Sequence, residues 1–139
     1  MAQITTETCS GYYDGTGNYV RLEFMNSNPQ DRETCITDHL YKSGDEFAAN
    51  QTAIWEGEIL LSCAGNKFRP IGGFSFRFHT VDGWLGDTDE LRLCSVTAQF
   101  GGPDDAGYSM WEWTGDLYNA HYSGGESQSN WTTMAKMVG

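Results

Sequence analysis

Three segments of the chain alternate between apolar and polar residues with a period of two, which is the pattern of half-buried β-strands. These segments are Tyr19–Phe24, Phe74–His79 and Leu91–Phe100. In the third segment the apolar positions change parity near Cys94-Ser95, which predicts a β-bulge or a bend at that point. Ile59–Cys63 and Leu117–Tyr122 are further strand candidates. The pattern as a whole predicts an all-β fold.

Turn signals separate the predicted strands, among them Asp14-Gly15, Asp82-Gly83 and Gly101-Gly102-Pro103. Such short glycine-containing stretches are typical of tight connections between strands. One short helix is predicted, over Gly44–Ala53. The chain has 139 residues, which suits one domain with a core and is too short for two ordinary ones. We therefore expect a single all-β domain over residues 1–139.

A Trp-x-Gly-acid pattern occurs three times at an equal spacing of 29 residues, beginning at Trp55, Trp84 and Trp113. Equal spacing predicts repeated β-units, which must stack or close around an axis to share a core. Coincidence in a chain rich in Trp and Gly is the alternative.

The four cysteines, Cys9, Cys35, Cys63 and Cys94, are widely spaced and contain no C-x-x-C. An even number with wide spacing favours disulfides over zinc. Three connectivities are possible, and stacking of neighbouring units favours Cys9–Cys35 with Cys63–Cys94. The alternative is four buried thiols in a cytosolic protein.

Two glycosylation triplets, at Asn50 and Asn130, favour the extracellular interpretation. No secretory apolar segment is present, so Met1 is interpreted as a start codon placed before a mature secreted chain. No apolar run reaches the length of a membrane span. We therefore expect a secreted glycoprotein.

The net charge of −11 limits the choice of partners. An acidic surface repels phosphate backbones and anionic lipids, which argues against nucleic acids and membranes as partners. Glycans and extracellular glycoproteins remain as expected partners.

The middle of the chain resembles a repeat of the vitelline membrane outer layer protein I family. The likeness rests on Trp55 and Cys63, the segment Ile71–Arg77, and the segment Gly86–Cys94. It implies a β-prism of three sheets, a place in an extracellular coat and affinity for oligosaccharides. The family has a doubled Asp before its Thr, whereas only Asp87 is present here, and the unit from Met110 onward lacks the closing half. A lipase-associated β-sandwich of the PLAT kind is the alternative, because Asp82-Gly83-Trp84 before a strand occurs there too.

Aromatic residues beside acids form a candidate carbohydrate site, because sugars stack on rings while acids hold hydroxyls. Trp111 is the preferred ligand residue. The full set is Trp111, Trp113, Asp116, Trp84 and Asp87. For the Trp residues at the 29-residue period, Trp55, Trp84 and Trp113, filling the core is the favoured interpretation.

Two clusters of oxygen donors are candidate calcium ligands, since Ca²⁺ requires several hard oxygen ligands. They are Asp87, Asp89 and Glu90 in one loop and Asp104-Asp105 in another. Neither matches an EF-hand, and solvated turns are the alternative. Apart from this possible Ca²⁺, no cofactor is expected.

Catalytic signatures are absent from the sequence. His39, His79 and His121 are isolated, and there is no H-E-x-x-H and no G-x-S-x-G. We therefore expect a non-catalytic, lectin-like secreted domain that binds glycans or forms part of a coat. An extracellular protein-interaction, matrix or venom component is the second hypothesis, and a small polysaccharide hydrolase is the third.

Overall fold

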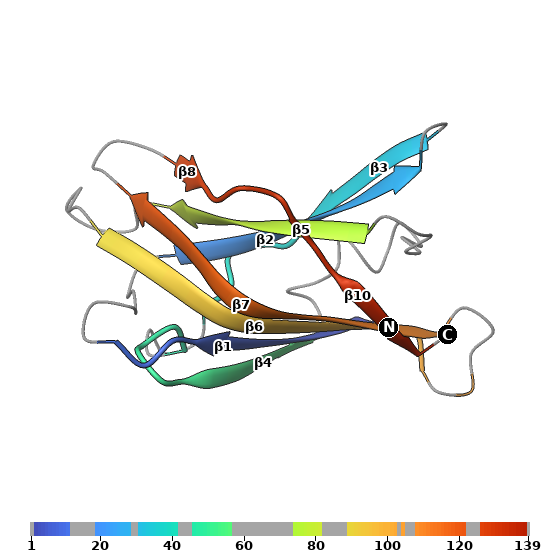
Figure 1. The fold of residues 1–139 in the computed structure, drawn as a ribbon, viewed down its shortest axis with the longest axis horizontal. Helices are drawn as coiled ribbons and strands as arrows, with labels where there is room; N and C mark the ends of the chain where they lie inside the picture. The colour runs from blue at the N-terminus through green and yellow to red at the C-terminus, as the bar shows by residue number, and fades with distance from the viewer. Residues whose placement is uncertain are drawn as a thin grey trace.

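Two antiparallel β-sheets make up the described part of the protein (Figure 1). The computed structural model describes residues 2–11, 19–28, 31–41, 46–56, 74–81, 89–102, 104, 108–121 and 126–138. The first sheet has the strand order β10-β7-β6-β1-β4, and the second has the order β3-β2-β5-β8, with β9 also paired to β5. The all-β prediction is confirmed.

The strands follow the predicted segments where these are described, with longer bounds. The first sheet contains β1 (Ala2–Thr8), β4 (Thr52–Glu56), β6 (Asp89–Phe100), β7 (Ser109–His121) and β10 (Ala135–Val138). The second contains β2 (Tyr19–Asn28), β3 (Asp31–Ile36), β5 (Phe74–Val81), β8 (Glu126–Gln128) and β9 (Thr132–Thr133).

Aromatic side chains from both sheets meet in the core between them. Phe74 of β5 packs edge-on against Phe100 of β6 and Trp111 of β7, with ring centroids 5.6 and 5.0 Å apart. Phe24 of β2 also meets Phe100, at 6.0 Å. Burying each such ring contributes about 1.5–3 kcal/mol. The period-two alternation of the strands therefore becomes a buried face on each sheet.

A β-bulge at Cys94 confirms the predicted change of parity in β6. Thr8 of β1 pairs with Leu93, but the preceding residue Glu7 pairs with Ser95, so Cys94 is the extra residue. Because of this bulge, the odd-numbered leucines before it and the even-numbered Val96 after it all face the core.

The disulfide pairing corrects the prediction. Cys9 is bonded to Cys94, with Cα atoms 5.1 Å apart, so both Cys9–Cys35 and Cys63–Cys94 are wrong. The prediction assumed that neighbouring units stack in chain order. Instead β1 lies between β4 and β6, and the pairing of β1 with β6 carries Cys9 to the bulge. Cys35 is also disulfide-bonded, and among the described residues no cysteine is free.

The structure also bears on the predicted helix and on the predicted β-prism. The helix predicted over Gly44–Ala53 is wrong, because the described residues 46–50 form turns and Thr52 begins β4. The described strands form two sheets, so the three-sheet β-prism is not confirmed. The predicted strand Ile59–Cys63 lies outside the described residues.

Candidate functional site

Trp111, the preferred sugar-binding residue, lies in the core. Its side chain is 4% exposed, and its ring packs against Phe74. The indole N–H donates a hydrogen bond to the Ser109 hydroxyl at 3.1 Å, so the one polar group of the ring is satisfied inside the protein. The structure therefore gives Trp111 a packing role rather than a place on a binding surface.

Trp113 lies on the same inner face and is half-buried at its margin. Its ring packs against Phe76 with centroids 5.4 Å apart. The ring also lies over Gly115, where a Cβ atom would come within 3.0 Å of Trp113 Cζ2. Gly115 of the Trp-x-Gly pattern therefore makes room for the tryptophan, which is a packing explanation for the motif.

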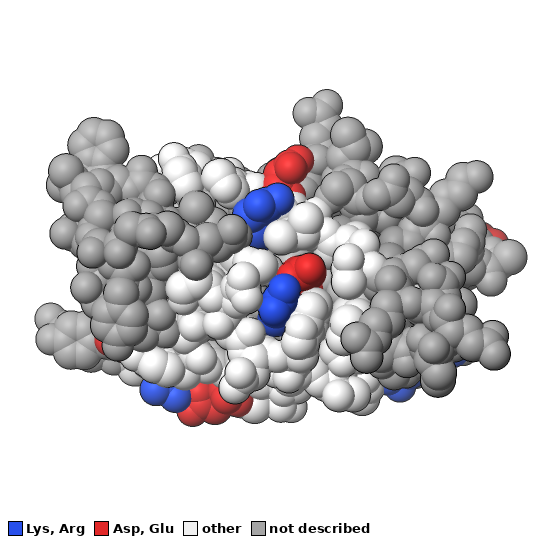
Figure 2. All heavy atoms as spheres, turned by 90° about the horizontal axis from the view of Figure 1, so that it is seen from above, with Lys and Arg blue, Asp and Glu red and all other residues white. Residues whose placement is uncertain are grey.

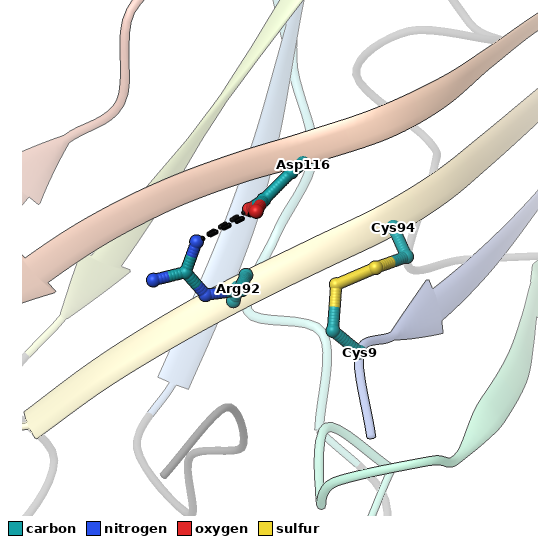
Figure 3. The surroundings of a disulfide bond; sticks show 4 residues. All are labelled: Cys9, Arg92, Cys94 and Asp116. Atoms are coloured by element: carbon teal, nitrogen blue, oxygen red, sulfur yellow. Dashed lines mark hydrogen bonds and ion pairs between the residues drawn. A yellow bond between two sulfur atoms is a disulfide. The ribbon is translucent and has the colours of Figure 1, made fainter. Parts of the chain in front are cut away.

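Asp116 lies on the opposite face of β7, away from both tryptophans. Arg92 Nη1 donates hydrogen bonds to its two carboxylate oxygens at 2.6 and 2.8 Å, as Figure 3 shows beside the Cys9–Cys94 disulfide. The Arg92 guanidinium also covers the Tyr118 ring at 4.7 Å. The predicted site is thus divided between two faces of the sheet, and its other members, Trp84 and Asp87, lie outside the described residues.

The candidate calcium ligands do not come together in the described structure. Glu90 accepts a hydrogen bond from the Tyr118 hydroxyl, and Asp104 is exposed in a turn. Asp89 begins β6, while Asp87 and Asp105 lie outside the described residues. Within the described ranges, no three His, Cys, Asp or Glu side chains are grouped as a metal site.

A different cluster is exposed on the outer face of the second sheet, and we call it the aromatic–arginine surface: Tyr19, Arg21, His39 and Tyr41. The Tyr19 ring stacks on His39 with centroids 4.8 Å apart and an interplanar angle of 9°. Tyr41 meets Tyr19 edge-on at 5.2 Å and is 44% exposed. His39 is also exposed, so part of this aromatic group is available to a ligand.

Backbone hydrogen bonds along β2 position this surface. After β3 the chain runs beside β2, with Leu40 N donating to Val20 O at 2.8 Å and Thr37 N to Leu22 O at 2.9 Å. Leu40 and Val20 are buried, so the residues next to them in the chain face outward. The alternation that buries the apolar side of β2 thereby places Tyr19 beside His39.

Arg21 is held in a defined orientation at the edge of the aromatic group. Its Nε donates to the backbone oxygen of Thr37 at 2.9 Å. Thr37 is fully buried, and its hydroxyl accepts a hydrogen bond from Leu22 N at 3.0 Å. Since Thr37 is fixed on both sides, the guanidinium is anchored to the framework of the sheet.

Glu23 is the centre of a second polar group on the same face. Its Oε1 accepts hydrogen bonds from Arg77 Nε at 2.7 Å and from His79 Nε2 at 2.9 Å. Arg77 also lies over the Trp131 ring at 4.4 Å and donates to the side chain of Gln128. Figure 2, seen from the side of the second sheet, shows described charged groups as adjacent positive and negative pairs on a largely uncharged surface.

The charge on Glu23 is stabilised by these neighbours. Burial raises the pKa of the Glu23 carboxyl, but hydrogen bonds from His79 and Arg77, with their positive charges, together lower it further. The net pKa therefore lies below the ordinary value of 4.5. The carboxylate stays ionised at neutral pH and keeps Arg77 and His79 in place.

Both glycosylation asparagines are exposed. Asn50 lies in a turn with φ of 65°, a conformation that Asn tolerates better than most residues, and Gln51 and Thr52 beside it are exposed too. Asn130 is exposed beside the half-buried Trp131. Both acceptor side chains are therefore accessible at the protein surface.

The aromatic–arginine surface is not among the predicted sites, although the sequence contains part of the signal for it. The alternation in Tyr19–Phe24 places Tyr19 and Arg21 on the polar side of the strand. Nothing local in the sequence indicates that His39 and Tyr41 lie beside them, because that contact depends on the path of the chain after β3.

The chain matches no protein-family model and no curated protein. The described residues contain no helix that is long and apolar enough to cross a membrane.

Proposed function

We propose that this protein is a non-catalytic, secreted module that binds glycans through the aromatic–arginine surface. The observation that carries the proposal is a group of three rings beside the anchored side chain of Arg21. In this group half-buried Tyr19 stacks on exposed His39 and meets exposed Tyr41 edge-on. An exposed ring offers an apolar face to a sugar ring, and neighbouring polar groups hold its hydroxyls.

The cysteines support the extracellular part of the proposal. Cys9 and Cys94 are paired, and Cys35 is disulfide-bonded as well. Disulfides persist in oxidising compartments and are rare in the cytosol. The two exposed sequon asparagines fit the same setting.

The β-sandwich is the architecture we favour for the whole chain, over the β-prism. The aromatic core lies between two sheets, and Phe74 and Phe76 of the second sheet contact Trp111 and Trp113 of the first. This arrangement resembles a sandwich of the PLAT kind more than a prism, whose core lies among three sheets. A crystal structure that contains a third sheet around the same core would contradict this choice.

A glycan array with matched tyrosine variants tests the proposed function. Tyr41 and Tyr118 are each 44% exposed, on the outer faces of the second and first sheets. We expect Tyr41→Ala to weaken binding of the array's best ligand about tenfold, a loss of about 1.4 kcal/mol. We expect Tyr118→Ala to leave that affinity within about twofold.

Two outcomes would count against the proposed function. One is an array on which the wild-type protein binds no glycan, with or without added calcium. The other is equal weakening by the two tyrosine variants, which would place the ligand elsewhere. Thermal unfolding of both variants checks the fold, because surface substitutions alter stability by only about 0.5 kcal/mol. Capture of a protein partner that resists glycosidase treatment would support the protein-interaction hypothesis instead.

A further inference from the structure

Arg21 differs from the other arginines whose side chains the structure describes. Arg77 is paired with Glu23, and Arg92 is paired with Asp116. Arg21 forms its hydrogen bond with a neutral backbone oxygen, that of Thr37, and has no carboxylate partner in the described structure. This is notable in a protein with 19 acidic and 8 basic residues, where acidic partners are plentiful.

The hydrogen bond to Thr37 leaves one end of the guanidinium available. It uses Nε, so the fork formed by Nη1 and Nη2 makes no hydrogen bond to the described residues. Such a fork matches a planar carboxylate and binds it through two parallel hydrogen bonds. Because Thr37 fixes Nε, less side-chain entropy is lost when a ligand binds.

Among the described residues, no acidic side chain forms an ion pair with Arg21. The next acidic residue on the same face of β2 is Glu23, which already accepts hydrogen bonds from Arg77 and His79. Asp38 follows Thr37, the residue whose backbone oxygen binds Arg21. It is exposed and forms no ion pair within the described structure.

The aromatic rings lie on the same face, close enough for one ligand to touch both features. Tyr19 and Arg21 are two residues apart on β2, about 7 Å along the strand. Their contacts on the neighbouring segment are His39 and Thr37, also two residues apart. A single sugar ring with an attached carboxylate spans this distance.

We infer that the aromatic–arginine surface selects acidic saccharides, with the Nη fork of Arg21 binding a ligand carboxylate while a sugar ring packs against Tyr19, His39 and Tyr41. This inference rests on the proposed function and specifies the ligand class of the same surface. It assigns Arg21 as the residue that determines specificity.

The test compares paired oligosaccharides that differ only in the carboxylate. Suitable pairs are galacturonate and galactose tetramers, and glucuronate and glucose tetramers, in which a carboxylate replaces the hydroxymethyl group at C6. Wild-type protein is expected to bind the carboxylated member of at least one pair about fivefold more tightly or better, about 1 kcal/mol. A sulfated counterpart of that member distinguishes carboxylate recognition from attraction to any anion.

Substitutions at Arg21 give the decisive comparison. Arg21→Gln is expected to abolish the preference while binding of the neutral member remains, and Arg21→Lys to retain only part of it, because an ammonium lacks the planar fork. Arg92→Gln, on the first sheet, is the control and is expected to keep the full preference.

The outcomes separate the two proposals. Equal binding of both members of every pair, still weakened by Tyr41→Ala, overturns the inference and leaves the proposed function in place. A preference that survives Arg21→Gln, or equal binding of the sulfated counterpart, also overturns the carboxylate assignment. Absence of binding to all of these saccharides overturns the inference, and absence of binding to every glycan on the array overturns the proposed function as well.

Discussion

Trp111 and Trp131 differ in the residues that contact each indole ring. Trp111 lies between the two sheets, 4% exposed, against Phe74. Trp131 is half-buried on the second sheet, where the guanidinium of Arg77 covers one face of its ring. The same residue type therefore serves packing in one region and a polar surface network in the other. An aromatic residue can therefore be assigned to the core or to a binding surface only when the strand that packs against it is known.

Replacing each tryptophan with alanine tests this difference most strongly. We expect Trp111→Ala to lower the free energy of unfolding by about 3–5 kcal/mol, because it leaves a cavity against Phe74. Trp131→Ala should cost about 1 kcal/mol, mainly through the lost contact with Arg77. Urea unfolding followed by circular dichroism measures both values. Similar losses for the two variants would remove the distinction between the regions.

The Cys9–Cys94 disulfide is a crosslink within the first sheet, which sharpens the comparison. It joins Cys9, directly after β1, to Cys94 of β6 and closes a loop with a sequence separation of 85 residues. We expect the double variant Cys9→Ser/Cys94→Ser to lose about 2–4 kcal/mol of unfolding free energy, chiefly because the unfolded chain gains freedom. Ligand affinity at the second sheet should be unchanged under conditions where the variant stays folded. A loss of affinity in the folded variant would show that the two regions are coupled.

The smallest expected effect concerns Glu23 and depends on pH. Its pKa is lowered in the folded state, so its stabilising contribution is complete above the unfolded value near 4.5. The contribution is lost as the pH falls through the lower folded value. We expect Glu23→Gln to cost about 1–2 kcal/mol at pH 7. This difference from wild type should shrink as the pH falls below 4.5 and through the lower folded pKa.

Unfolding measurements across that pH range check the prediction for Glu23. Glu112→Gln is the matched control, because it removes an exposed carboxylate that forms no ion pair with the described residues. A difference between wild type and Glu23→Gln that stays constant with pH would argue against the role assigned to this carboxylate.

The strands and their parity could be predicted from the sequence because they depend on local alternation. Tyr19–Phe24 and Phe74–His79 lie within β2 and β5, and the parity change at Cys94 marks a true bulge. For Trp111 and Trp113, alternation showed that the two share a face. It did not show that this face is the inner one, which depends on the phenylalanines of β5 packing opposite.

The order of strands and the disulfide could not be predicted, because both depend on pairings between distant segments. The sequence contains no local sign that β1 lies between β4 and β6. The pairing of Thr8 with Leu93 carries Cys9 to Cys94, and the same kind of long-range contact places His39 against Tyr19. The candidate site was not predicted for that reason, although the alternation in β2 placed Tyr19 and Arg21 together on its polar face.

The bulge at Cys94 determines how the chain tolerates changes in length. Deletion of this one residue would reverse the side-chain orientation of all residues on one side of it in β6. Either Leu91 and Leu93 or the stretch from Val96 to Phe100 would then turn toward solvent, because strand residues alternate strictly between faces. Substitution at position 94 removes a crosslink, whereas deletion would invert half of a central strand. We therefore expect the fold to tolerate a substitution at position 94 better than a deletion there.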